Sequence, residues 1–221
     1  MANTNPIKNS RYGVYEGRLK AAEDLLKQAS PKILLDIGCR DSGQQERFYK
    51  YSEKVFLVDV DYKVLPPFIG LGKTYPVCGD GCILPYKDNS FDAVLCAEVI
   101  EHVPDAVSML KECKRVLKNE GYIIITTPNR GRIANYIRKL IGKEYKLPYM
   151  VHSGPGGYHV REYTMKDLEK DFLRADFKVV CWKPTFFGLS FEDKLPLGTI
   201  RFANMFLRYN ATLAVLAQKI I

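Results

Sequence analysis

The chain has little of what marks membrane, secreted or zinc-binding proteins. No apolar run approaches the roughly eighteen residues of a membrane span, and the polar start MANTNPIKNSRYG has no signal-peptide core. The six cysteines include one C-x-x-x-C pair, Cys78 and Cys82, without a second pair, so no metal site is predicted. Internal repeats and low-complexity segments are also missing. We therefore expect a cytoplasmic protein whose cysteines stay reduced.

What is present indicates a nucleotide-binding unit. The 221 residues are 47% hydrophobic, which is enough for one α/β domain with a full-sized core. Ile33–Ile37 is a short apolar run typical of a strand buried on both faces, and it leads directly into Gly38. A second such run, Val55–Val58, ends in Asp59. A glycine turn lets a ligand approach backbone N–H groups, and a carboxylate can accept both hydroxyls of a ribose.

The turn itself discriminates between two cofactor classes. A dinucleotide needs its pyrophosphate against a helix N-terminus and the spacing G-x-G-x-x-G, whereas this turn has glycine only at Gly38 and Gly43. Asp41 would place a negative charge where the phosphates bind. A sulfonium cofactor carries no phosphate and tolerates an acidic turn. S-adenosylmethionine is therefore the preferred cofactor, and a nicotinamide oxidoreductase is a distant alternative.

The rest of the chain repeats the alternation of strand and helix. Further strands are predicted at Tyr75–Cys78, Phe91–Ala97, Tyr122–Thr127, Phe177–Trp182 and Thr212–Lys219, and helices at Gly17–Gln28, Asp105–Lys118 and Gly131–Gly142. Gly121 is expected to close the helix that ends at Lys118. Thr164, with Asp167 three residues later, is a predicted helix N-cap.

With the segments DNSFDAVLCAEVIEHV and RVLKNEGYIIITTPN in this order, residues 32–180 resemble the class I S-adenosylmethionine-dependent methyltransferases, in particular the small-molecule group. The resemblance implies a Rossmann-like α/β fold, with a seven-stranded, mostly parallel sheet, an antiparallel last strand and helices on both faces. Residues 1–221 would form a single methyltransferase domain. Residues 1–30 would be a cap helix, and residues 130–163 and 184–210 insertions on the substrate side.

The resemblance also implies which residues bind the S-adenosyl-L-methionine. The first loop passes under the methionine part, Asp59 binds the ribose, Asp80 receives the adenine amine, and Gly81 offers a backbone N–H to the ring. The expected cofactor-binding set is Asp36, Gly38, Cys39, Asp59, Val60, Asp80, Gly81, Cys96 and Ala97. Arg40 and Ser42 stand where the family more often has glycine, which bears on affinity more than on function.

The three histidines are the candidate general bases, because an imidazole pKa lies near neutrality. In the family, a pair such as Glu101 and His102 mostly supports the turn after the fourth strand. His152 and His159 flank a glycine-rich loop. We expect His159 to be the catalytic, substrate-facing residue, and a structural role for it stays open.

The substrate is less defined by the sequence. The net charge is +8, and Arg130, Arg132, Arg138, Lys139, Lys143 and Lys146 cluster after the fifth strand. That basic helix is either a solvated outer face, or a lid over the active site that favours an anionic or lipid-linked substrate or that touches a membrane surface. Before the first helix, Arg11, Tyr12 and Tyr15 would form another wall of the site, where the two tyrosines either cover the cofactor, as in the resembling family, or pack in the core. The late aromatic segment would line an apolar substrate pocket or bury a dimer contact; its members are Phe186, Phe187, Phe191, Phe202, Met205 and Phe206. Nucleic acid is not an expected partner, because the basic residues are not interleaved with stacking aromatics and no N-P-P-[YF] motif occurs.

The sequence thus predicts methyl transfer to a small-molecule acceptor, with oxygen preferred over nitrogen or carbon. Two alternatives stay open: a non-catalytic protein that binds S-adenosylmethionine, and a methyltransferase acting on a lipid-linked or anionic macromolecular substrate. The oligomeric state and the pathway are left undetermined by the sequence.

Overall fold

A computed structural model describes residues 6–39, 47–142, 159–189, 197–199 and 207–220. The strands are β1 (Ile33–Ile37), β2 (Lys54–Asp59), β3 (Thr74–Cys78), β4 (Phe91–Ala97), β5 (Leu117–Pro128), β6 (Phe177–Trp182), β7 (Phe187–Leu189), β8 (Leu197–Thr199) and β9 (Thr212–Lys219). The α-helices are α1 (Pro6–Ala29), α3 (Ala106–Val116), α4 (Ile133–Leu140) and α5 (Met165–Arg174), and the short 3₁₀ helices are η1 (Tyr62–Val64), η2 (Pro66–Phe68), η3 (Ile100–His102) and η4 (Leu207–Tyr209).

The main sheet has seven strands in the order β3-β2-β1-β4-β5-β9-β6. Strands β1 to β5 pair in parallel, whereas β9 lies antiparallel to both β5 and β6. This arrangement confirms the predicted α/β class, with its mostly parallel sheet and antiparallel last strand. The order also reverses next to β1, so the carboxyl ends of β1 and β4 flank the kind of crevice in which open α/β sheets bind ligands.

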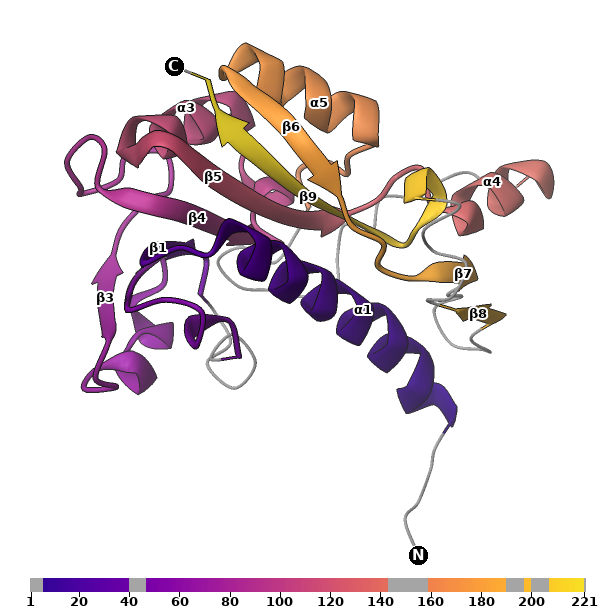
Figure 1. Cartoon of the computed structure of the whole chain (residues 1–221). Helices are drawn as coiled ribbons and strands as arrows, with labels where there is room; N and C mark the ends of the chain where they lie inside the picture. The colour runs from indigo at the N-terminus through magenta and orange to yellow at the C-terminus, as the bar shows by residue number, and fades with distance from the viewer. Residues whose placement is uncertain (1–5, 40–46, 143–158, 190–196, 200–206, 221) are drawn as a thin grey trace, which may run out of the picture.

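Helices cover both faces of the sheet, as predicted (Figure 1). Alternate residues of a strand point to opposite faces, and neighbours in β1 accordingly belong to different cores. Leu34 packs in the core under α1, with Leu25 of that helix. Leu35 packs in the core under α3 and α5, with Leu110 and Phe172. Both layers therefore hold β1 and the turn that follows it in place.

Two helix boundaries differ from the sequence prediction. Helix α1 begins at Pro6 rather than at Gly17, and it packs against β5 and β9. Helix α3 ends at Val116, and β5 follows it at once from Leu117. The positive φ of 61° belongs to Glu120, not to Gly121. Gly121 is needed for another reason: a Cβ there would lie 2.9 Å from the carbonyl oxygen of Lys118.

The predicted start of the helix after the substrate-side segment is confirmed. The Thr164 hydroxyl accepts from the backbone N–H of Asp167, and the Asp167 carboxylate accepts from the backbone N–H of Thr164, which is a complete capping box. The basic helix predicted over residues 131–142 is α4. Of the helices that the structure describes, none combines the length and apolar character needed to cross a bilayer.

Several sequence predictions fall on residues outside the described ranges, and they stay predictions. These are the first-loop residues Arg40, Asp41 and Ser42, the loop 151–158 with His152, the basic residues Lys143 and Lys146, Phe191, Phe202, Met205 and Phe206, and the side chains of Arg11, Tyr12 and Phe187.

Candidate functional site

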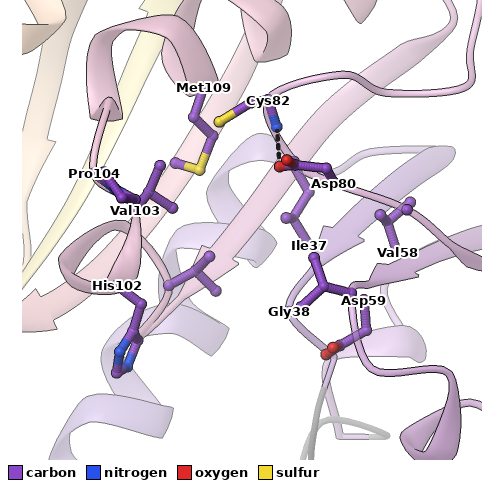
Figure 2. Close-up of a pocket in the computed structure, with 14 residues that line it drawn as sticks. Ile37, Gly38, Val58, Asp59, Asp80, Cys82, His102, Val103, Pro104 and Met109 are labelled. Carbon is purple, nitrogen blue, oxygen red and sulfur yellow. Dashed lines mark hydrogen bonds between the residues drawn. The ribbon is translucent and has the colours of Figure 1, made fainter. Parts of the chain in front are cut away.

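A cavity of about 270 Å³ opens beyond the carboxyl ends of β1 and β2. Strand ends and their turns form one wall, and the segment that runs from η3 to α3 forms the other (Figure 2). The lining residues are Ile37, Gly38, Val58, Asp59, Val60, Gly79, Asp80, Gly81, Cys82, Val99, His102, Val103, Pro104 and Met109. The cavity thus joins the turns after β1, β2 and β3, which is where the sequence placed the cofactor.

Gly38 is the position at which β1 turns toward the cavity. Its φ is +76°, and a Cβ there would lie 2.4 Å from Cγ2 of Val99. Its backbone N–H donates to the carbonyl oxygen of Val58 over 2.7 Å. Both the dihedral angle and the close approach require glycine, because a side chain would strain the turn and strike Val99.

Two carboxylates stand along the β2 and β3 wall, at the rim of the cavity. Asp59 ends β2, is 8% exposed, and accepts from the backbone N–H of Asp61 over 2.9 Å. Asp80 follows β3, is exposed, and accepts from the backbone N–H of Cys82 over 2.8 Å. Each turn fixes the orientation of its carboxylate. Gly81 packs closely behind, since a Cβ there would lie 3.1 Å from Cγ2 of Ile37.

Asp36 lies beneath the turn rather than on the cavity wall. It is completely buried, and the hydroxyl of Tyr49 donates to its Oδ2 over 2.9 Å, while Oδ1 has no hydrogen-bond partner. Burial, reinforced by the nearby charge of Asp59, raises the pKa of Asp36 to about 7, although the Tyr49 hydrogen bond opposes the rise. Asp36 is therefore partly neutral near pH 7.

Three other predicted cofactor residues do not line the cavity in the described structure. Cys39 and Cys96 are fully buried, and Ala97 is half-buried. Burial raises the pKa of the Cys39 thiol, and the contact with Cys113 together with burial raises that of Cys96, so both thiols are neutral. Their side chains pack in the two cores; the backbone roles expected of Cys96 and Ala97 stay predictions. Val60, by contrast, does line the cavity and is 62% exposed.

The opposite wall carries one histidine, His102, with a second histidine directly behind it. His102 lines the cavity, on the side facing Asp59 and Asp80 (Figure 2). The ring of His159 packs edge-on against it, with the ring centroids 5.0 Å apart. Burial, followed by the neighbouring His102, lowers the pKa of His159 below its usual value near 6.5, so its imidazole is neutral at pH 7. The substrate-facing residue that the sequence favoured therefore lies one ring behind the cavity wall.

Two acidic residues lie near these imidazole rings, and neither of them was assigned a chemical role from the sequence. Glu101 is fully buried, and its Oε2 accepts from the Thr127 hydroxyl over 2.9 Å. Glu98 has a φ of +58° and pairs with Arg18 of α1 at 2.8 Å. Burial and the charge of Glu98 raise the pKa of Glu101 well above its usual value. The spacing E-x-x-E-H at Glu98–His102 was the available signal for this cluster, but sequence alone reads it as support for the turn.

The comparisons with known proteins agree with this geometry. A family model described as "Methyltransferase domain" matches residues 35–125, which run from β1 into β5. An uncharacterized protein of Methanocaldococcus jannaschii is 30% identical over 172 residues, covering 75% of this chain and 67% of its own. The chain belongs to the class I S-adenosylmethionine-dependent methyltransferases.

Two further proteins are similar to this methyltransferase. A ubiquinone biosynthesis O-methyltransferase of Nitrosomonas europaea is 27% identical over 158 residues, covering 69% of this chain and 65% of that protein. The crystal structure of a putative methyltransferase from Bacillus halodurans superposes with a TM-score of 0.63 at 18% identity, over 90% of this chain and 99% of the other. The latter shows the shared fold. The chain spans about two thirds of the length of these curated relatives.

The cofactor of this methyltransferase is S-adenosyl-L-methionine, and the described cavity fits it. Its described lining includes two carboxylates and no lysine or arginine. Such a wall suits a ligand that carries a sulfonium and an ammonium charge, whereas it would repel a pyrophosphate. The negative charge of the cavity lining is thus a physical reason for the expected preference for S-adenosylmethionine over a dinucleotide.

Proposed function

We propose that this methyltransferase transfers the methyl group of S-adenosyl-L-methionine to a hydroxyl oxygen of a small-molecule acceptor. The observation that supports the proposal is His102 on the cavity wall opposite the two carboxylates, with the ring of His159 packed edge-on behind it. A hydroxyl must lose its proton to become a good nucleophile, and a neutral imidazole is the group that most often receives one. The relative of N. europaea named as an O-methyltransferase supports oxygen as the accepting atom.

In this proposal, the β1 and β2 turns hold the cofactor. The carboxylate of Asp59 binds the ribose hydroxyls, Asp80 and Gly81 receive the adenine, and the turn at Gly38 passes under the methionine part. These assignments are supported by the lining of the cavity and by the resemblance of the motifs. The cofactor, when bound, supplies an activated methyl group. The acceptor oxygen forms the new bond to the methyl carbon while the carbon–sulfur bond breaks, its electron pair staying on sulfur.

His159 is the residue we assign to the acceptor. Its side chain is one-quarter exposed and its ring packs edge-on against His102, so it lies behind the His102 side of the cavity and not at the turns of Gly38 and Asp59. Its neutral imidazole has two ways to activate a hydroxyl: it accepts the proton directly, or it binds a cation that makes the hydroxyl more acidic. Measuring methyl transfer after a chelator has removed metal ions separates the two routes, because only the second route requires a metal ion.

The α4 segment gives less support to a lipid-like or anionic substrate. Arg130 pairs with Asp167 at 2.8 Å, and Arg132 pairs with the buried Glu162 at 2.7 Å. Two of the basic residues are thus neutralised within the described structure and tie α4 to the start of α5. Peripheral contact with a membrane and a cytoplasmic location stay sequence predictions.

The test is an acceptor panel. Purified protein is incubated with S-adenosylmethionine and matched phenols, catechols, amines and carbon acids, and S-adenosylhomocysteine and methylated product are measured by mass spectrometry. We expect methyl transfer to a hydroxyl compound. Methylation confined to amines or carbon acids would overturn the choice of oxygen. Tight binding of S-adenosylhomocysteine without turnover on any acceptor would instead support the non-catalytic alternative.

A further inference from the structure

Three side chains converge beside the cavity with the donor set of a metal site. Glu101, His102 and His159 each present one potential ligand atom, and these atoms all lie within 4.8 Å of one another. Glu101 and His102 belong to η3, whereas His159 comes from the segment before α5. Hydrogen bonds from the backbone N–H groups of Val160 and Arg161 to the carbonyl oxygen of Glu101, over 2.7 and 3.3 Å, bring the two segments together.

Unsatisfied polar atoms cluster at the same place. In the described part of the chain, Oε1 of Glu98, Oε1 of Glu101 and Nδ1 of His159 are buried and have no hydrogen-bond partner. Glu101 is fully buried, so an orphaned carboxylate oxygen there is costly for the fold. A cation between these groups would satisfy them. These unsatisfied atoms therefore indicate a ligand at the place where the three side chains converge.

Neighbouring side chains orient two of these three residues, as hydrogen-bonding groups around a metal site commonly do for its ligands. The Thr127 hydroxyl holds the other oxygen of Glu101, at 2.9 Å. Glu162 lies 3.9 Å from Nδ1 of His159 and is itself anchored by Arg132. Such contacts fix the orientation of ligands before an ion arrives.

We propose that Glu101, His102 and His159 bind a divalent first-row transition-metal ion, with Glu98 beside the site. Two imidazoles and one carboxylate form a mixed nitrogen and oxygen set, which suits manganese, iron, cobalt or zinc better than magnesium or calcium. Three protein ligands leave coordination positions open to a substrate. Because His102 also lines the cavity, an acceptor hydroxyl in the cavity reaches those positions.

The metal's role rests on the proposed function, whereas its binding does not. A bound hydroxyl becomes more acidic on a divalent cation and releases its proton to solvent. The oxygen then attacks the methyl carbon, and the proton that left balances the positive charge lost at sulfur. His159 acts in this scheme as a metal ligand and not as the proton acceptor.

Metal binding is tested first without cofactor or acceptor. Full-length protein is stripped with a chelator and titrated with Mn²⁺ or Zn²⁺ alone in a calorimeter. We expect one equivalent to bind, and we expect Glu101→Gln and His159→Ala each to lose at least about tenfold in affinity. Glu169→Gln is the matched control, because it removes one carboxylate from the exposed face of α5, and it should bind like the wild type. Absence of stoichiometric binding, or unchanged binding in both variants, would overturn the site.

A spectroscopic measurement covers the case in which a variant fails to fold. Circular dichroism reports whether each variant is native, and Co²⁺ added to the stripped wild-type protein reports imidazole ligation through its visible absorption. A spectrum identical to that of Co²⁺ in buffer would refute the site without any variant. S-adenosylhomocysteine affinity is measured on the same samples. Metal binding without any methyl transfer would support the metal site and refute the proposed function. Methyl transfer that is unaffected by chelation would support the proposed function and refute the metal's role in it.

Discussion

The side chain of Val99 packs directly against Gly38: a Cβ on residue 38 would lie 2.4 Å from Cγ2 of Val99. We expect Gly38→Ala to weaken S-adenosylhomocysteine binding and to destabilise the protein by about 2 kcal/mol or more, because a positive φ and a steric clash add together. That loss corresponds to roughly 4–8 °C in melting temperature for a chain of this size. Thermal unfolding and calorimetry provide the measurements.

Gly72 supplies the control for that substitution. It also has a positive φ, +60°, but no atom lies within 4 Å of the position that a Cβ would take there. Gly72→Ala should show the backbone strain alone and leave cofactor affinity unchanged. Equal losses in the two variants would mean that the contact with Val99 has no consequence.

Asp59 is expected to be the main polar anchor of the cofactor. Asp59→Ala removes charge-assisted hydrogen bonds worth roughly 1.5–3 kcal/mol each. Affinity for S-adenosylhomocysteine, measured by calorimetry, should fall at least about tenfold, since ~1.4 kcal/mol corresponds to one decade. Asp61→Asn is the control, because the Asp61 side chain caps η1 and does not line the cavity. If Asp59→Ala binds as tightly as the wild type, the ribose assignment is wrong.

His159→Ala should separate turnover from cofactor binding. The imidazole lies on the His102 side of the site, so the Gly38 and Asp59 contacts remain intact and S-adenosylhomocysteine affinity should be unchanged. Steady-state turnover on the best acceptor should fall about a hundredfold or more, whether the imidazole takes a proton or holds a metal. A loss of only a few-fold would mean that His159 merely positions the acceptor. Parallel losses in affinity and turnover would indicate a structural role.

Asp36 should make stability depend on pH. In the unfolded chain its pKa is about 3.8, and in the folded protein burial raises the pKa to about 7. Between these values folding takes up a proton, so the stabilisation is fully present below about pH 4 and is lost as the pH rises through 7. The loss amounts to roughly 4 kcal/mol at about 1.36 kcal/mol per pH unit.

Asp36→Asn removes that dependence. Denaturant unfolding at pH 5 and at pH 8 should show that the variant gains stability relative to the wild type at the higher pH. The comparison between the two pH values cancels the intrinsic cost of an asparagine at this position. A constant difference between the proteins at both pH values would show that Asp36 titrates normally.

Local patterns were sufficient to predict much of the fold. The bounds of β1 and β4 match the apolar runs Ile33–Ile37 and Phe91–Ala97, and the capping box at Thr164 is present. Buried strands and caps are encoded by residues close together in sequence, which explains this agreement. The passage from α3 into β5 was predicted less well, because Gly121 is required by its contact with Lys118 and not by a helix end.

The candidate site was predictable only in part, for a related reason. Gly38, Asp59 and Asp80 each follow a recognisable strand, so their places at the cavity could be inferred. Glu101 and His159 lie close together in the cluster although they are 58 positions apart in sequence. No local pattern encodes it, since it depends on backbone hydrogen bonds formed only in the folded chain.

The main chain and the side chain of residue 101 have different roles. Its main-chain oxygen accepts from Val160 and Arg161, while its side chain faces the histidines. Any amino acid at this position retains the main-chain acceptor, so the attachment of the His159 segment does not depend on the carboxylate. A single substitution at residue 101 therefore changes the chemistry of the cluster and retains the main-chain hydrogen bonds that hold the His159 segment.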